Sequence, residues 1–280
     1  MIRGPAVNQF NWLYSNADAP STTPGTAVTP GTSNAEGSWV QIASAANIAN
    51  RVYALALNLN AGNSTGVAKN HLLDIGIDQA GGTSYTAVFQ NLPIGQSGPF
   101  TEGARSFYFP LEIPAGASVA ARIQGSDATA GSVRVVAKFY GKPSRPDLLR
   151  VGRYTETVGT ITNSLGVSVT PGNSGAEGSW VSLGTLAQRC WFYQLGVQCN
   201  NGTVTAMVYH FDLAVGDGTN KNIIIPNHCV YVRGTAEAAN NFADTLAYRD
   251  LPAGAELFLR GSASGTAVSG WNAAVIAVGG

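Results

Sequence analysis

Hydrophobic and polar residues alternate with a period of two along several segments of this chain. The hydrophobic members of the clearest runs are Tyr53, Leu55, Leu57 and Leu59; Val119, Ala121 and Ile123; and Val133, Val135, Ala137 and Phe139. Successive side chains of a β-strand point to opposite faces, so each run predicts a strand with one buried face. Turns that contain Gly and Pro separate the runs, and no helical stripe is longer than a turn or two. The pattern predicts an all-β protein.

The same features occur twice, in the same order. Residues 28–40, which end in Ala-Glu-Gly-Ser-Trp-Val, reappear as residues 169–181. Residues 53–60 match residues 193–200 at an offset of 140, and residues 73–77 match 211–215 at an offset of 138. The period far exceeds that of a solenoid repeat, so each copy is expected to be a whole domain. In the second copy Tyr193, Leu195, Val197 and Cys199 are expected to face inward, and Gln194, Gly196 and Gln198 outward.

Short strands separated by turns in each copy predict two tandem β-sandwich domains that resemble jelly rolls. We expect an N-terminal arm at residues 1–16, a first sandwich at 17–141, a linker at 142–151 and a second sandwich at 152–280. Pro143 and Pro146 favour a stiff linker.

The N-terminal arm carries Phe10, Trp12 and Tyr14 at alternate positions, so three aromatic rings would share one strand face. Two interpretations are open. The rings could cover the first sandwich, or they could form a candidate subunit-docking arm, since aromatic residues are enriched at protein interfaces.

Charge is scarce in this chain. Asp, Glu, Lys and Arg make up 11% of the residues and the formal net charge is zero, whereas roughly 25% is usual. Nucleic-acid binding needs clustered Lys and Arg, and no run reaches the length of a membrane span. We therefore expect no nucleic-acid partner and no membrane insertion, and we expect part of the surface to be covered by other subunits.

Residues with catalytic or metal-binding chemistry are few and scattered. His71, His210 and His228 lack the spacing of a metal site, and the three cysteines all lie in the second copy, which argues against a disulfide framework. Cys199 is expected to be buried; Cys190, nine residues earlier, would face the opposite way on a continuous strand. We predict no catalytic, metal-binding or cofactor-binding residues, no cofactor, and no enzymatic activity.

The ionisable residues that do recur belong to both copies. Asp74 and Asp212 match, as do Arg122 and Arg260, and Glu36 and Glu177 stand beside the matching Trp39 and Trp180. A feature that both copies share is expected to serve the common fold, as a buried charge pair or a carboxylate that anchors a turn. The run from Gly216 to Asn220 is expected to form a hairpin turn.

The chain resembles the small structural proteins of tailed bacteriophages. The resemblance rests on residues 107–116 (Phe-Tyr-Phe-Pro-Leu-Glu-Ile-Pro-Ala-Gly), on residues 119–124 and on the repeated Ala-Glu-Gly-Ser-Trp-Val motif. The resemblance implies a virion protein of the decoration, fibre, spike or baseplate type, assembled in the host cytoplasm. Its partners would be copies of itself and other virion proteins, and a closed trimer would present six similar sandwiches. The alternative function is a glycan-binding module for host recognition, whose partner would be a host surface glycan; a hydrolase is the remaining hypothesis.

Overall fold

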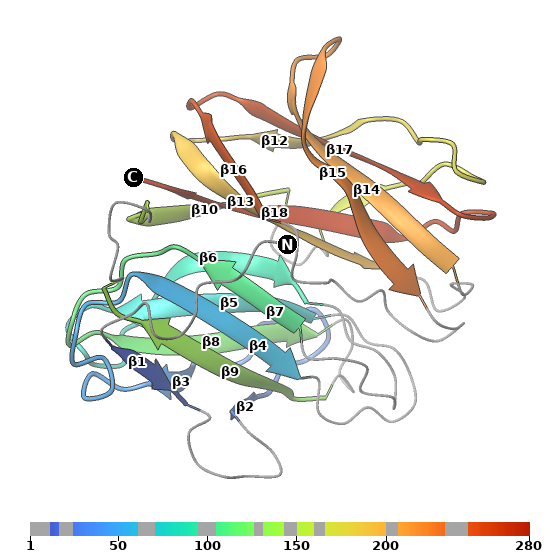
Figure 1. Ribbon diagram of the computed structural model, residues 1–280. Helices are drawn as coiled ribbons and strands as arrows, with labels where there is room; N and C mark the ends of the chain where they lie inside the picture. The colour runs from blue at the N-terminus through green and yellow to red at the C-terminus, as the bar shows by residue number, and fades with distance from the viewer. Residues whose placement is uncertain are drawn as a thin grey trace.

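The computed structural model describes residues 12–16, 25–60, 71–94, 105–125, 131–142, 150–159, 166–199, 207–232 and 246–280. These residues form 18 β-strands, arranged in four antiparallel sheets and two sandwiches (Figure 1). In the part of the chain so described, no helix has the length and apolar character needed to cross a membrane.

The first sandwich contains the first nine strands: β1 (Leu13–Ser15), β2 (Thr26–Val28), β3 (Val40–Ala43), β4 (Ala54–Asn60), β5 (His71–Asp78), β6 (Thr86–Pro93), β7 (Arg105–Phe109), β8 (Ser118–Gly125) and β9 (Val133–Tyr140). One sheet has the order β1-β9-β4-β7, with β2 also paired to β9, and the other has the order β3-β8-β5-β6. When β1 and β2 are counted as one interrupted strand, this is the strand order of an eight-stranded jelly roll.

The second sandwich repeats this arrangement with β10 (Tyr154–Val158), β11 (Val167–Val169), β12 (Val181–Thr185), β13 (Cys190–Cys199), β14 (Met207–Gly216), β15 (Lys221–Val232), β16 (Leu246–Leu251), β17 (Glu256–Ala263) and β18 (Trp271–Gly279). Its sheets have the orders β10-β18-β13-β16, with β11 paired to β18, and β12-β17-β14-β15. The predicted pair of tandem β-sandwiches is confirmed.

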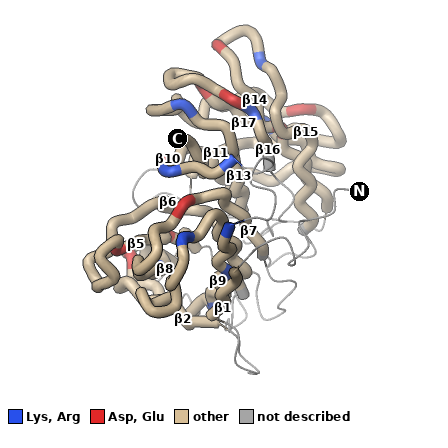
Figure 2. Tube along the Cα trace, turned by 60° about the vertical axis from the view of Figure 1, so that its left-hand side comes forward, with Lys and Arg blue, Asp and Glu red and all other residues tan. Residues whose placement is uncertain are grey.

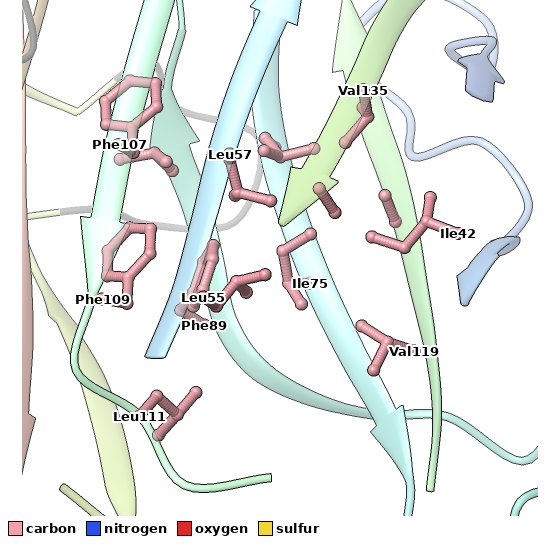
Figure 3. Packing of buried hydrophobic residues seen from close by; sticks show 14 of the residues in the cluster. Ile42, Leu55, Leu57, Ile75, Phe89, Phe107, Phe109, Leu111, Val119 and Val135 are labelled. Carbon is pink, nitrogen blue, oxygen red and sulfur yellow. The ribbon is translucent and has the colours of Figure 1, made fainter. Parts of the chain in front are cut away.

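The core of the first sandwich lies between its two sheets (Figure 3). Leu55 and Leu57 of β4 are fully buried and face Ile75 of β5, while the rings of Phe89 and Phe109 lie 4.6 Å apart. Leu55 and Leu57 are inward positions that the alternating pattern predicts. Burial of such side chains is the main favourable term in folding.

The register of the repeat differs from the sequence match by two residues. Val28 pairs with Val133 in the first domain, and Val169 pairs with Trp271 in the second. From these anchors, Leu59, which pairs with Val135, corresponds to Val197 on β13. The offset between β4 and β13 is therefore 138, and the offset of 140 was wrong. A shift of two residues leaves every side chain on the same face, so the alternating pattern could not detect it.

A bulge in β13 also changes one prediction about the cysteines. Cys190 and Cys199 both point into the second core, although they lie nine residues apart on one strand. The pairing of β13 with both neighbouring strands shifts between Cys190 and Phe192. The extra residue of a β-bulge reverses the direction of the side chains that precede it, so the expectation of opposite faces was wrong.

The second domain closes one side of the first. β6 contacts β10, β18 and β13, and β7 contacts β13, so the β6–β7 side of the first sandwich lies on the outer face of the β10-β18-β13-β16 sheet (Figure 1). Phe192, Ile276 and Val278 of that face join the core of the first domain. Gln194 and Gln198 face outward as expected, but they are fully buried there.

Candidate functional site

Each domain carries the same bonded set of ionisable residues. In the first domain the Oδ1 atom of Asp74 accepts the backbone N–H of Asn91 at 2.7 Å, and Oδ2 accepts Arg122 Nε at 2.8 Å. Arg122 also contacts Glu36 at 2.6 Å and lies over the Trp39 ring, 4.4 Å from its centroid. Burial and the nearby Asp74 carboxylate raise the pKa of Glu36.

The second domain repeats the arrangement with its own residues. Asp212 Oδ1 accepts the N–H of Asn227 at 2.7 Å, and Oδ2 accepts Arg260 Nη2 at 2.8 Å. Arg260 contacts Glu177 at 3.5 Å and lies over the Trp180 ring at 4.5 Å. Both carboxylate oxygens of each aspartate are thus engaged within the fold, which confirms the predicted charge pair. The N–H groups that they accept belong to Asn91 and Asn227, which lie within strands β6 and β15, so the carboxylates anchor strands and not turns.

Other candidate residues also have local roles. Asp217 Oδ1 accepts the N–H groups of Thr219 and Asn220, which confirms the hairpin turn and lowers the pKa of Asp217. Burial raises the pKa of the Cys190 thiol to about 12. Cys199 is buried as expected, and Cys229 is exposed. Among the described residues no group of three or more His, Cys, Asp or Glu side chains could hold a metal ion.

A groove of about 550 Å³ lies between the two domains, where β6 faces β10. Ala87 of β6 and Thr155 of β10 both line it. At one end, the Thr157 hydroxyl donates to the Gln90 carbonyl at 2.8 Å and accepts the Gln90 N–H at 3.3 Å. The groove is therefore a seam between two edge strands that meet mainly through side chains.

At the opposite edge of the sheet that contains β10, an aromatic side chain is exposed to solvent. Tyr248 of β16 is 61% exposed, and its ring is stacked on Trp191 with centroids 6.1 Å apart and an interplanar angle of 20°. Arg150 lies over the same Trp191 ring at 4.9 Å. Asp250, two residues after Tyr248, accepts two hydrogen bonds from Arg189 at 2.8 and 2.6 Å. The exposed Tyr248 ring is thus supported by the buried Trp191 ring, and Asp250, which binds Arg189, lies further along β16.

The predicted docking arm is partly described. Trp12 and Tyr14 pack against the first core, and Tyr14 is stacked on Phe139 at 5.8 Å. Leu13, between them, is 41% exposed. Phe10 lies outside the described residues. The described part of the arm covers its own sandwich, and its docking role stays a prediction.

The exposed residues of β15 and β16 were not singled out from the sequence. Ile223 and Tyr231 of β15 are 39% and 48% exposed, and Tyr248 is on β16. A signal existed: Ile223 occupies the position of Ala87 in the first copy, since Ala87 pairs with Gly76 and Ile223 with the matching Ala214.

Charged residues are sparse and dispersed over both domains (Figure 2).

No protein-family model and no curated protein sequence matches the chain. Among solved structures it is similar to PNGF-II, with 9% identity, a TM-score of 0.39, and coverage of 91% of this chain and 64% of that chain. It is similar to a peptide-N(4)-(N-acetyl-β-D-glucosaminyl) asparagine amidase, with 11% identity, a TM-score of 0.39, and coverage of 95% and 96%.

A further likeness is to the tandem CBM22 domains of Paenibacillus barcinonensis Xyn10C, with 11% identity, a TM-score of 0.30, and coverage of 95% and 89%. The chain is also similar to structures of a virus and of virus-derived particles, with TM-scores of 0.33 and 0.25. The chain spans less than two thirds of the PNGF-II chain. At TM-scores below 0.5, these likenesses carry no argument about what the chain binds or does.

Proposed function

We propose that this protein is a non-enzymatic structural protein of a bacteriophage virion, which assembles as an oligomer on the capsid or the tail. The observation that carries the proposal is where exposed hydrophobic side chains lie. Of the four large ones in the described residues, Ile223, Tyr231 and Tyr248 lie on β15 and β16. Single exposed hydrophobic residues are ordinary, but three of the four on two neighbouring edge strands favour a surface that a partner covers.

Two further features support the proposal. The chain has 11% charged residues, and charge is depleted at the centres of protein interfaces. The ionisable residues that both domains share, Asp74 with Arg122 and Asp212 with Arg260, bind each other within the fold, which agrees with a structural role for them. The proposed location in a virion comes from the resemblance of residues 107–116 and 119–124, and of the repeated Ala-Glu-Gly-Ser-Trp-Val motif, to phage structural proteins.

Light scattering coupled to size-exclusion chromatography tests the assembly. We expect a discrete oligomer, and a smaller mass when Ile223→Asp places a charge on β15. A matched control is Gln41→Asp, because Gln41 is exposed on β3 of the other domain. A monomer at every concentration would overturn the proposed assembly. Immunogold electron microscopy of phage particles with an antibody to the chain tests the virion location, and unlabelled particles would overturn it.

A second candidate function is glycan binding at Tyr248. Sugars stack on flat aromatic rings and take hydrogen bonds at their edges. The Tyr248 ring is stacked on Trp191, and Asp250, two residues further along β16, accepts hydrogen bonds from Arg189. A partner of this class would be a host surface glycan.

A glycan array separates the two candidates. Binding that Tyr248→Ala abolishes and Tyr231→Ala leaves unchanged would support a glycan site, because both tyrosines are exposed but only Tyr248 is stacked on a buried Trp ring. If no glycan binds the wild-type chain, this candidate fails and the assembly proposal is unaffected.

A further inference from the structure

The two sandwiches have equivalent edges in different surroundings. In the first domain, β6 and β7 end their sheets and lie against the second domain. Their counterparts β15 and β16 also end their sheets. The first domain thus shows, within one chain, what kind of surface can cover this side of the sandwich.

The burial of equivalent residues records the difference. Asn91 and Asn227 occupy the same place, since each donates its N–H to the aspartate of the neighbouring strand. Asn91 and the following Pro93 are buried, whereas Asn227 and Cys229, which stands at the position of Pro93, are exposed. The edge of the second sandwich is therefore open in the described chain where the first is closed.

The surface that closes the first domain also has an equivalent. The closing surface is the outer face of β10 and β18 in the second domain, where Thr155 pairs with Val278. In the first domain Leu13 of β1 pairs with Tyr140 of β9, which corresponds to Val278. Val278 is fully buried, but Tyr140 is half-buried and Leu13 is 41% exposed.

The outer face of β1 and the edge strand β15 each expose a large hydrophobic side chain at equivalent places of the repeat. Within the chain, Ala87 and Thr155 line the same groove from opposite strands. Their counterparts are Ile223 and Leu13. Together with Tyr231 and Tyr248, these are the four large hydrophobic side chains that the described residues expose. The repeat therefore places an exposed leucine opposite an exposed isoleucine in a contact that one chain cannot make with itself.

We propose that chains associate head to tail, with the outer face of β1 and β9 of one copy seated on β15 and β16 of the next, as β10 and β18 sit on β6 and β7 within the chain. The inference deepens the proposed assembly function and rests on it. The partner is a second copy, and Leu13 of one copy contacts Ile223 of the other. Such a contact uses two different surfaces, so each copy can bind one neighbour on either side. The chains then form a ring if the rotation between copies closes, and an open filament if it does not.

The contact between chains is more polar than the one within the chain. Lys138 and Tyr140 stand where the second domain has Ile276 and Val278, both of which are fully buried in the first core. Less apolar area is removed from water, so the association is weaker than the internal docking and depends on protein concentration.

Cross-linking tests the pairing directly. The variant Leu13→Cys/Ile223→Cys, with Cys229→Ser to remove the exposed native thiol, is treated with a short bismaleimide and separated on a denaturing gel. A positive control is Ala87→Cys/Thr155→Cys with Cys229→Ser, because this pair spans the equivalent groove inside one chain. A negative control places the first cysteine at Gln41, exposed on the opposite sheet.

We expect a ladder of dimers and higher multimers from the Leu13/Ile223 variant, a cross-linked monomer from the positive control and no ladder from the negative control. Light scattering of the untreated protein separates two kinds of failure. An oligomer without the ladder would overturn the head-to-tail contact and leave the assembly function standing. A monomer without the ladder would overturn both.

Discussion

Pro93 of the first domain lies directly against Gly196 of the second. A Cβ atom at Gly196 would come within 2.8 Å of Pro93 Cδ and 3.4 Å of its carbonyl oxygen. Gly196 is on the outer face of β13, in the strand that is buried on both sides. The absence of a side chain at this position allows the two domains to dock.

Substitution of Gly196 by Ala should weaken the docking. The proline ring is rigid, so relief of the overlap must move one domain relative to the other, and overpacking of this kind costs roughly 1–3 kcal/mol. Urea denaturation of the full chain measures the loss. The control is Gly218→Ala, because a Cβ atom there meets nothing within 4 Å. Equal stabilities for the two variants would show that the Pro93–Gly196 contact does not limit docking.

Removal of the buried carboxylate of Asp74 should be strongly destabilising. The Asp74→Ala variant removes the acceptor of the Asn91 N–H and one of the two carboxylates that bind the Arg122 guanidinium, so that only Glu36 remains. The loss of one partner from a buried pair costs about 3–5 kcal/mol. The Asp74 side chain is 3% exposed. Arg51→Ala is the comparison: Arg51 is 57% exposed and bonded to Glu112, and such surface pairs contribute about 0–1 kcal/mol. A loss below that of Arg51→Ala would contradict a structural role for Asp74.

Mixed variants should reveal that the contact between chains is head to tail. Leu13→Asp disables one surface and Ile223→Asp disables the other, so each variant alone should be monomeric by light scattering. A mixture should form a dimer and nothing larger, because each variant keeps the surface that the other has lost. A mixture that stays monomeric, or that regains the wild-type mass, would be incompatible with two distinct surfaces.

The three cysteines should differ in reactivity. Cys229 is exposed, and Cys190 and Cys199 are buried. A thiol reagent at neutral pH should therefore modify one cysteine in the native protein and all three after unfolding, while Cys229→Ser should show none in the native state. Rapid native modification of more than one thiol would mean that the β13 core opens readily.

Burial of the Cys190 thiol should make the protein less stable at alkaline pH. Burial raises its folded pKa to about 12, whereas an unfolded cysteine ionises near pH 8.5. The unfolded state therefore loses its proton first, so the contribution of Cys190 to stability is full below that pH and falls as pH rises towards 12. Thermal melts between pH 8 and 10.5 should show a smaller loss for Cys190→Ala than for wild type, after correction for the different starting stability.

Much of the fold follows from local patterns. Leu55 and Leu57 are buried as their alternation predicts, and the duplicated Asp74 and Asp212 indicated a shared structural role. The bulge after Cys190 has no such signature, because one inserted residue leaves the surrounding composition unchanged. Gln194 illustrates a second limit: its polar side chain predicts exposure, but the other domain covers it.

The proposed contact surface was harder to predict than the fold. The arm around Trp12 and Tyr14 was identified by its aromatic rings, yet these two rings pack on their own sandwich and the less conspicuous Leu13 points outward. Ile223 resembles any other β-strand residue until it is compared with Ala87 in the correct register. The second domain covers β6 but leaves β15 exposed. The exposure of Ile223 therefore depends on how the domains dock, which the local sequence pattern does not record.

Duplication of the domain gives the two kinds of contact a definite order in time. The two domains belong to one polypeptide, so their docking occurs at an effective concentration on the order of millimolar, independent of how much protein the cell contains. Contacts between chains must wait until enough copies have accumulated. Under the proposed head-to-tail contact, the chain reaches its folded two-domain form first and associates with other copies only above a threshold concentration, so the supply of newly made protein would set when assembly begins.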